Sequence, residues 1–346
     1  MQGFVTDPPL FRNVVPAAAI SSESICSVVV DAEEDFDWAA PVQGTRTSTS
    51  HMKNVRLLCE LLGAFGIVPT YLLTYPVLED DEVIHIVRRQ FDAGQCAIGV
   101  QLHPWVTPPF DGSPSRHRSF SGNLGGNLEE RKLVALKARF RQAFGFDPTV
   151  YRAGRYGLSE NSSAILEKHG FEIDTSVAPR TDFSKEGGVD YSSFGSHPFW
   201  FGRHRRLLEI PLCRDVVGWA GAAASSLYRS VSGELTSRFH VLSVLTRSRC
   251  AERITLSPEG NDTGAMRRLV RGLRSQRQPV FTLSFHSSSL QVGRNPYVQS
   301  QADLHRFYDR MSATLDYLAT DLSFRFASIQ DIPALLTPPP PLSAVP

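Results

Sequence analysis

Hydrophobic residues along the chain alternate between short, β-branched runs and longer stretches in which apolar positions recur three or four residues apart. A short continuous apolar run predicts a buried strand, and the wider spacing predicts a helix with one apolar face. Eight strands are expected on this basis, at residues 25–30, 67–73, 96–102, 149–153, 171–175, 207–212, 280–285 and 324–327.

Helices are expected in the longer stretches between these strands, where polar capping residues and glycines mark the ends. The clearest examples are a helix over 52–65, one that starts at Asp80 or Asp81, one with Asn127 as its N-cap and Glu130 three residues on, one between 159 and 170, and one over 302–319. Residues 215–277 are expected to hold two or three more helices.

The alternation of strands and helices predicts an α/β fold. About seven or eight parallel strands joined by right-handed crossovers would close most simply into a distorted (β/α) barrel, and an open doubly wound sheet is the alternative. Neither a G-x-G-x-x-G nor a G-x-x-x-x-G-K motif is present, so nucleotide binding of those kinds is not supported. We expect an irregular segment at 1–22, one catalytic barrel at 23–335 and a disordered, proline-rich tail at 336–346.

Composition narrows the class of protein. The 346 residues carry a net charge of +1, which argues against a nucleic-acid-binding surface, and no apolar run approaches the roughly 18 residues of a membrane span. The five cysteines are scattered and form no paired motif, which is typical of a reducing compartment. Because no basic leader precedes the short apolar stretch at 14–20, we expect a cytoplasmic protein.

Polar residues collect where the predicted strands end. An acidic run from Asp31 to Asp37 follows the first strand, and Gln101, His103 and Trp105 end or follow the third. The remaining candidates lie at the later strand ends: Arg152, Arg155, Tyr156, Asp174 and His286. Each of them alone could be a packing or solvated residue. In a barrel the carboxyl ends of the strands share one face, so together they predict a metal-assisted or acid–base hydrolase.

The order of these motifs, from about residue 25 to 330, resembles the polysaccharide deacetylase superfamily, which includes chitooligosaccharide and peptidoglycan N-deacetylases. The resemblance implies Asp31 as the base and Glu33 as a metal-binding carboxylate. Arg152 with Tyr156-Gly157 is similar to the arginine motif of the family, and Asp174-x-Ser176-x-x-Pro179 is similar to its fourth motif. Leu283-Ser284-Phe285-His286 resembles the last motif, in which the histidine is the acid.

The second motif departs from that pattern. The family has two histidines four residues apart on one loop, and Gln101 and Trp105 fall on those two positions here. A glutamine amide is a poor ligand for zinc beside imidazole. Two interpretations follow. Either His103 becomes the single histidine ligand, with Glu33 and one of Glu34, Asp35 or Gln101 completing the site, or metal binding is weak or absent.

The resemblance implies a metal-dependent hydrolase, with zinc as the expected ion, that removes an acetyl group from an amino sugar or a glycan precursor. Asp31 would activate water, Arg152 would hold Asp31, and Asp174 would support His286 as the acid. Trp38, Trp105, Tyr156 and Arg155 are expected to contact the substrate. Two alternatives remain: hydrolysis of a C–N bond in a small non-sugar amide or cyclic ureide, and a catalytically impaired relative that binds glycan.

Overall fold

The computed structural model describes residues 10–36, 42, 44–45, 47–204, 206–218 and 251–340. Trp38 lies outside the described residues, so its predicted contact with substrate has no counterpart in the structure. The same holds for residues 219–250, in which further helices are expected, and for most of the proline-rich tail.

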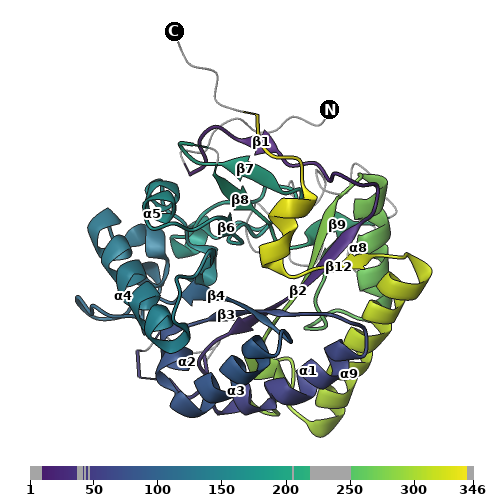
Figure 1. Cartoon of the computed structure of the whole chain (residues 1–346), viewed down its shortest axis with the longest axis horizontal. Helices are drawn as coiled ribbons and strands as arrows, with labels where there is room; N and C mark the ends of the chain where they lie inside the picture. Colours follow the sequence, from purple (N-terminus) through teal and green to yellow (C-terminus); the bar gives the residue numbers. More distant parts are fainter. Residues whose placement is uncertain are drawn as a thin grey trace, which may run out of the picture.

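A parallel sheet forms the centre of the molecule (Figure 1). All eight predicted strands are present, as β2 (Ile25–Ala32), β3 (Thr70–Leu73), β4 (Ala97–Leu102), β5 (Val150–Ala153), β6 (Ile173–Asp174), β8 (Leu207–Glu209), β11 (Val280–His286) and β12 (Arg325–Phe326). Their order is β8-β6-β5-β4-β3-β2-β11, with β12 pairing β2, and every one of these pairings is parallel. The predicted α/β class is therefore confirmed.

Four short strands were not predicted. β1 (Val15–Pro16) and β7 (Phe199–Phe201) extend one edge of the sheet in antiparallel fashion, and β9 (Arg214–Val217) pairs with β10 (Glu252–Thr255) in a separate two-stranded sheet. The strand ladder does not close between β8 and β11. Single backbone hydrogen bonds cross this gap instead, from Leu256 N to Cys213 O (2.8 Å) and from Ser284 N to Leu256 O (3.1 Å).

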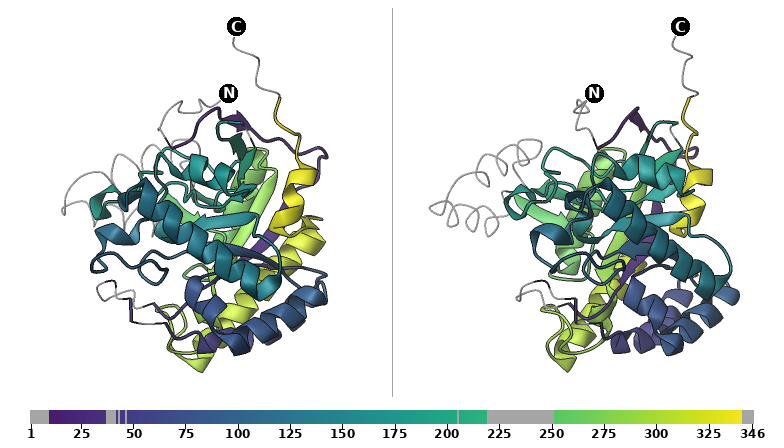
Figure 2. Two further views of the ribbon diagram at one scale, coloured as in Figure 1. Left: turned by 60° about the vertical axis from the view of Figure 1, so that its left-hand side comes forward. Right: turned by 90° about the vertical axis from the view of Figure 1, so that its left-hand side faces the viewer.

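Helices surround the sheet on its outer side (Figures 1 and 2). The α-helices are α1 (Val55–Gly63), α2 (Tyr75–Glu79), α3 (Asp81–Asp92), α4 (Gly126–Phe144), α5 (Ser162–Lys168), α8 (Thr263–Ser275) and α9 (Gln301–Asp316). Short 3-10 turns include η1 (Ser50–Asn54), η4 (Gly154–Tyr156), η5 (Ser184–Glu186), η8 (Ser287–Leu290) and η10 (Ile329–Leu335), and a π-turn, η9 (Tyr317–Asp321), follows α9.

Two of the predicted N-caps can be compared with the helix starts in the structure, those of α3 and α4. Asp80 caps α3, since one of its carboxylate oxygens accepts from the backbone N–H groups of Glu82 and Val83. The prediction of Asn127 as the cap of α4 is wrong, because Gly125, at φ +77°, lets the chain turn earlier and the helix begins at Gly126. Glu130 does not return to the helix start; its carboxylate contacts Lys168 and His169.

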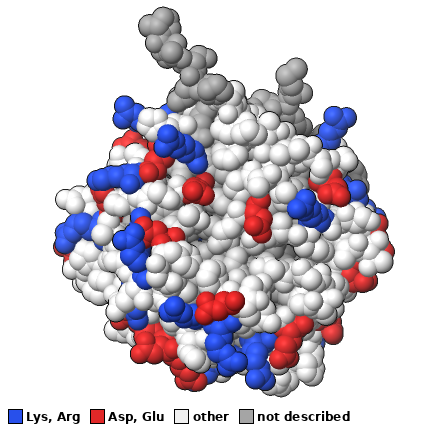
Figure 3. Space-filling model, viewed as in Figure 1, with Lys and Arg blue, Asp and Glu red and all other residues white. Residues whose placement is uncertain are grey.

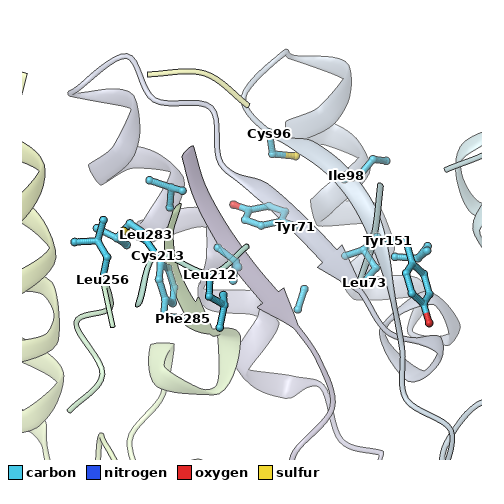
Figure 4. Packing of buried hydrophobic residues seen from close by; sticks show 14 of the residues in the cluster. Tyr71, Leu73, Cys96, Ile98, Tyr151, Leu212, Cys213, Leu256, Leu283 and Phe285 are labelled. Atoms are coloured by element: carbon cyan, nitrogen blue, oxygen red, sulfur yellow. The ribbon is translucent and has the colours of Figure 1, made fainter. Parts of the chain in front are cut away.

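The core lies between the strands and the surrounding helices (Figure 4). Side chains of β3, β4, β5 and β11 gather there with Leu212, Cys213 and Leu256 from the segments that cross the gap. All eight residues of β2 are buried. Carboxylates at the end of such a strand lose their hydration, and they are stable there only with hydrogen-bonding or charged partners.

The surface carries charges of both signs. On the face seen in Figure 3, basic and acidic side chains lie interspersed. No helix within the described ranges is long and apolar enough to cross a membrane.

Candidate active site

The site is built at the carboxyl ends of β11, β2, β4 and β5, with β3 between β2 and β4, and the parallel ladder fixes which side chains are level with one another. His286 at the end of β11 is level with Asp31 at the end of β2, and Gln101 on β4 is level with Arg152 on β5. The structure thus brings together predicted residues that are up to 255 positions apart in the chain.

Arg152 holds Asp31. The guanidinium is fully buried, and its Nη1 donates a hydrogen bond to Asp31 Oδ1. Its Nε donates to the carbonyl oxygen (3.1 Å) and the hydroxyl oxygen (2.8 Å) of Thr175. These bonds fix the guanidinium plane, so the second carboxylate oxygen of Asp31 keeps one orientation.

His286 is held by a residue that the sequence did not single out. Its Nδ1 lies 2.8 Å from Glu259 Oε2, and its Nε2 lies 3.8 Å from Asp31 Oδ2. Burial disfavours the imidazolium most strongly, but Glu259 and the nearby carboxylates of Glu33 and Asp31 outweigh this effect and raise the pKa of His286 to about 10. The imidazole of His286, the predicted acid, is therefore protonated at neutral pH.

The expected role of Asp174 beside His286 needs correction, since the largest carboxylate effect on His286 comes from Glu259. Asp174 lies on β6 and accepts a hydrogen bond from Ser176. The carboxyl group of Glu209, on β8, lies next to it. The carboxylate that contacts Nδ1 of His286 is Glu259, in the turn that follows β10, and not Asp174 at the end of the fifth predicted strand.

The predicted metal ligands lie around His103. Its Nδ1 donates to Glu34 Oε1 (2.8 Å), and its Nε2 lies 3.1 Å from the side-chain nitrogen of Gln101 and 3.5 Å from Glu33 Oε2. Because it accepts from Nδ1, Glu34 is a partner that orients the imidazole ring. Burial raises the pKa of Glu33 to about 7, against the opposing effects of His286 and His103.

Asp35 turns away from this group. One of its oxygens lies 3.1 Å from His51 Nδ1, and the other accepts from Arg294 (2.7 Å). His51 Nε2 lies 2.9 Å from Ser287 Oγ, which in turn accepts from the backbone N–H of Glu33 (3.2 Å). This chain of contacts fixes the loop that carries Glu33 and leaves Asp35 outside the proposed ligand set.

These contacts do not fit the metal centre proposed from the sequence. Within the described residues, no group of three or more His, Cys, Asp or Glu side chains is arranged to hold a metal ion. Of the four expected ligands, Glu34 is hydrogen-bonded to Nδ1 of His103, and Gln101 offers an amide nitrogen toward Nε2. Only Glu33 and His103 are left to face one ion, fewer than the three protein ligands usual for catalytic zinc.

The residues predicted to bind substrate are largely engaged within the protein. Trp105 is buried and stacks on His103, with ring centroids 4.2 Å apart. Arg155 pairs with Glu186 of η5, donates to Ser119 Oγ (2.7 Å) and lies over the ring of Phe120, so it ties two long loops together.

Tyr156 is the predicted substrate residue best placed at the site. Its ring stacks on Phe183 at 5.9 Å. Its backbone and that of Arg155 adopt φ values of +59° and +53°. Two successive non-glycine residues in this region store strain, a feature that concentrates at functional sites.

Two functional residues were missed. Glu259 lies four residues after β10, and Asp31 lies at the end of β2, so a search of the strand ends would have found Glu259 had β10 been predicted. Glu209 lies inside a predicted strand, where a lone carboxylate in an apolar run was itself a signal.

Comparisons with known proteins support the fold. No protein-family model matches the sequence, and no curated protein does either. Among solved structures, the chain is similar to a protein from Mycobacterium smegmatis assigned as a polysaccharide deacetylase, with a TM-score of 0.50 and 16% identity over 96% of this chain and 99% of that one. It is also similar to PuuE allantoinase, with a TM-score of 0.50 and 15% identity over 90% of each chain. The chain therefore has the fold of the polysaccharide deacetylases, and the resemblance drawn from its motifs is confirmed at the level of the fold.

Proposed function

We propose that this protein is a hydrolase that removes an acetyl group from the nitrogen of an amino sugar, with Asp31 as general base and His286 as general acid. The observation that carries the proposal is the facing pair itself. His286 Nε2 lies 3.8 Å from Asp31 Oδ2, and each side chain is held by a buried partner of opposite charge. A base and an acid in fixed positions on one face suit the hydrolysis of an amide.

In this mechanism, Asp31 takes a proton from a water molecule as the water oxygen attacks the acetamide carbon. The negative charge that develops on the carbonyl oxygen needs an N–H donor, and the backbone amide of Tyr156 in the strained turn after β5 is the proposed one. His286 then gives its proton to the departing nitrogen as the C–N bond breaks. The products are acetate and a free amine, and the proton on Asp31 returns to His286 or to solvent.

The choice of an amino sugar over a small ureide is supported by two hollows next to Asp35, which follows Asp31 and Glu33 in the chain. Asp35 lines one of two adjoining open hollows, which share Thr47 and Ser48, and neither Asp31 nor His286 is among the residues that line them. Their walls also contain Thr45, Thr49, Ser50, Tyr75 and Pro76. Hydroxyl groups beside a tyrosine ring suit a sugar, which offers hydroxyls at its edge and an apolar face.

The described residues do not fit a three-ligand metal site, and each of these steps uses only water and the side chains and backbone of the protein. The zinc expected from the family resemblance is a separate prediction. Metal analysis of untagged protein tests it, and His103→Ala is the variant that should lose any ion bound at Glu33 and His103.

The decisive test of the proposed function is Asp31→Asn, assayed by acetate release from N-acetylglucosamine oligomers. Loss of the general base should lower kcat by about 10²- to 10⁴-fold, while the far-UV spectrum stays that of the wild type. Asp92→Asn is the matched control, because Asp92 lies on α3 with its side chain 65% exposed. Full activity in Asp31→Asn would overturn the base assignment. Activity on a cyclic ureide but on no acetylated sugar would favour the small-amide alternative, and binding without turnover the impaired relative.

A further inference from the structure

We propose that Glu209 is a positioning residue, which shares one proton with Asp174 so that the two carboxyl groups together present a single negative charge to Arg152. The inference rests on the proposed function for its kinetic consequences. It accounts for two buried acidic side chains, Asp174 and Glu209, in the neighbourhood of the Arg152 guanidinium that holds Asp31.

The two carboxyl groups are neighbours in a closed space. Asp174 on β6 is level with Glu209 on β8 in the parallel ladder, and neither residue is exposed to solvent. Two ionised carboxylates side by side in such a place would each lose hydration and would repel each other. A shared proton removes both costs.

The hydrogen bonds leave a place for that proton. One oxygen of Asp174 accepts from Ser176 Oγ, which itself accepts from the backbone N–H of Ala153. One oxygen of Glu209 accepts from the backbone N–H of Val177 (2.9 Å). Among the described residues, the other oxygens, Asp174 Oδ2 and Glu209 Oε2, have no ordinary donor. A proton on Glu209 Oε2, donated to Asp174 Oδ2, satisfies both atoms.

The charges around the pair favour this arrangement. Arg152 faces it from β5, and the buried hydroxyls of Tyr151 and Tyr191 lie close by. Burial raises the pKa of Asp174 to about 7, against the opposing effects of Ser176 and Arg152, and burial together with the charge of Asp174 raises the pKa of Glu209 well above its usual range. Glu209 is thus the member that keeps the proton.

The consequence concerns the base. Arg152 donates a hydrogen bond to Asp31, and its positive charge also acts on both carboxyl groups of the pair. A pair with one negative charge balances the guanidinium without drawing it away from Asp31, whereas a doubly ionised pair would compete with Asp31 for its hydrogen bonds. Glu209 acts through Arg152 and does not touch the substrate.

Two substitutions at Glu209 test the proposal by rescue. Glu209→Leu leaves Asp174 without its donor and is expected to lower kcat at least tenfold with KM within about twofold of the wild type. Glu209→Gln supplies an uncharged N–H donor and should restore most of that rate. Glu172→Gln, at an exposed position just before β6, is the control and should match the wild type. A Glu209→Gln variant as slow as Glu209→Leu would overturn the proposal, because it would mean that the ionised carboxylate is needed.

A second measurement requires no substrate. A carboxyl group whose pKa is raised on folding stabilises the protein below its unfolded pKa, and this contribution is lost as pH rises toward the folded value. Glu209→Gln does not ionise, so its urea midpoint relative to the wild type should rise steadily from pH 5 to pH 8, while that of Glu172→Gln stays flat. A flat difference for Glu209→Gln would show that Glu209 is ionised in the folded protein. If no acetylated sugar is hydrolysed, the proposed function fails and this stability test still decides the proton's place.

Discussion

At the scale of single residues, Asp31 and His286, the proposed base and acid, are held in the same way. Each binds a buried partner through one oxygen or ring nitrogen and directs the other oxygen or nitrogen into the site. Asp31 is held by Arg152, and His286 is held by Glu259. Fixing the partner-facing atom sets the direction of the reacting atom without a ligand. Changes at the partners should therefore alter pH dependence or geometry more than folding.

Glu259→Gln is predicted to change the pH profile. The Glu259 carboxylate is the strongest of the groups that raise the pKa of His286 to about 10, so its neutral amide should lower that pKa by about one to three units. The alkaline limb of kcat/KM should move to lower pH by the same amount, with less change near pH 6. Glu252→Gln, which removes only the ion pair with Arg268, is the control. An unmoved alkaline limb would show that His286 is not the acid.

Gly154→Ala is predicted to disturb His103. A Cβ at this position would lie 2.5 Å from the carbonyl oxygen of Leu102 and 2.6 Å from His103 Cδ2. Both distances are too short, so the β4 strand end must shift, at about 1–3 kcal/mol of the free energy of unfolding and with a loss of activity. Gly63→Ala is the matched control, because its Cβ meets nothing within 4 Å. Urea unfolding of both variants checks the expectation, which equal stabilities would contradict.

The site residues could be predicted from the sequence, but the contacts among them could not. One site could be predicted because its members lie at the end of a recognisable strand or just after it: Asp31, Glu33, His103, Arg152 and His286. The hydrogen-bonding partner of each side chain could not be predicted. The supporting role expected of Asp174 went to Glu259, because the path of the chain after β10 places that carboxylate against Nδ1 of His286. Such choices depend on loop paths, which carry no periodic signal.

At the scale of elements, α4 fixes the loop that follows His103. Lys132 on α4 is buried, and its Nζ donates to the backbone carbonyls of Pro104, Thr107 and Pro109. Two of these residues are prolines, which cannot donate a backbone hydrogen bond and leave the loop few partners of its own. One ammonium group therefore holds the whole 104–109 turn against the helix.

Lys132→Met is predicted to destabilise the protein by about 2–4 kcal/mol, since three buried carbonyl groups lose a charged donor. Methionine keeps most of the volume, so the loss would come from the hydrogen bonds. Urea unfolding measures it, with Lys168→Met as the control, because the Lys168 side chain is 66% exposed and surface ion pairs contribute about 0–1 kcal/mol. Equal effects in the two variants would show that the loop does not depend on Lys132.

The eight parallel strands were predicted because the sequence around each of them shows an apolar run, although β6 and β12 themselves have only two residues. β1 and β7 have two and three residues, too few for a period, and β9 mixes charged with apolar positions. The cap of α4 failed for a local reason, because a glycine at positive φ displaced the expected asparagine.

At the scale of the whole molecule, the strand ladder of the parallel sheet is open between β8 and β11, the two strands that would have to pair to close a barrel. Thr282 on β11 helps to span this gap. Its hydroxyl oxygen accepts from the backbone N–H of Cys213 (2.9 Å) and donates to the carbonyl oxygen of Pro211 (3.2 Å). The side chain thus replaces the missing ladder bonds at the place where Leu256 enters, and Glu259 follows three residues later.

Thr282→Val tests whether this connection supports both the fold and the site. The substitution keeps the shape but leaves a buried N–H and a buried carbonyl unpaired, so it should lower the free energy of unfolding by about 1–3 kcal/mol. The turn that carries Glu259 should also loosen, and the alkaline limb of kcat/KM should move in the same direction as in Glu259→Gln. Thr320→Val, at an exposed threonine that contacts Asp316, should change neither quantity. A loss of stability without a change in the alkaline limb of kcat/KM would mean that Thr282 supports the fold alone. A change in both would show that the contacts between β11 and the segments across the gap also set the pKa of His286.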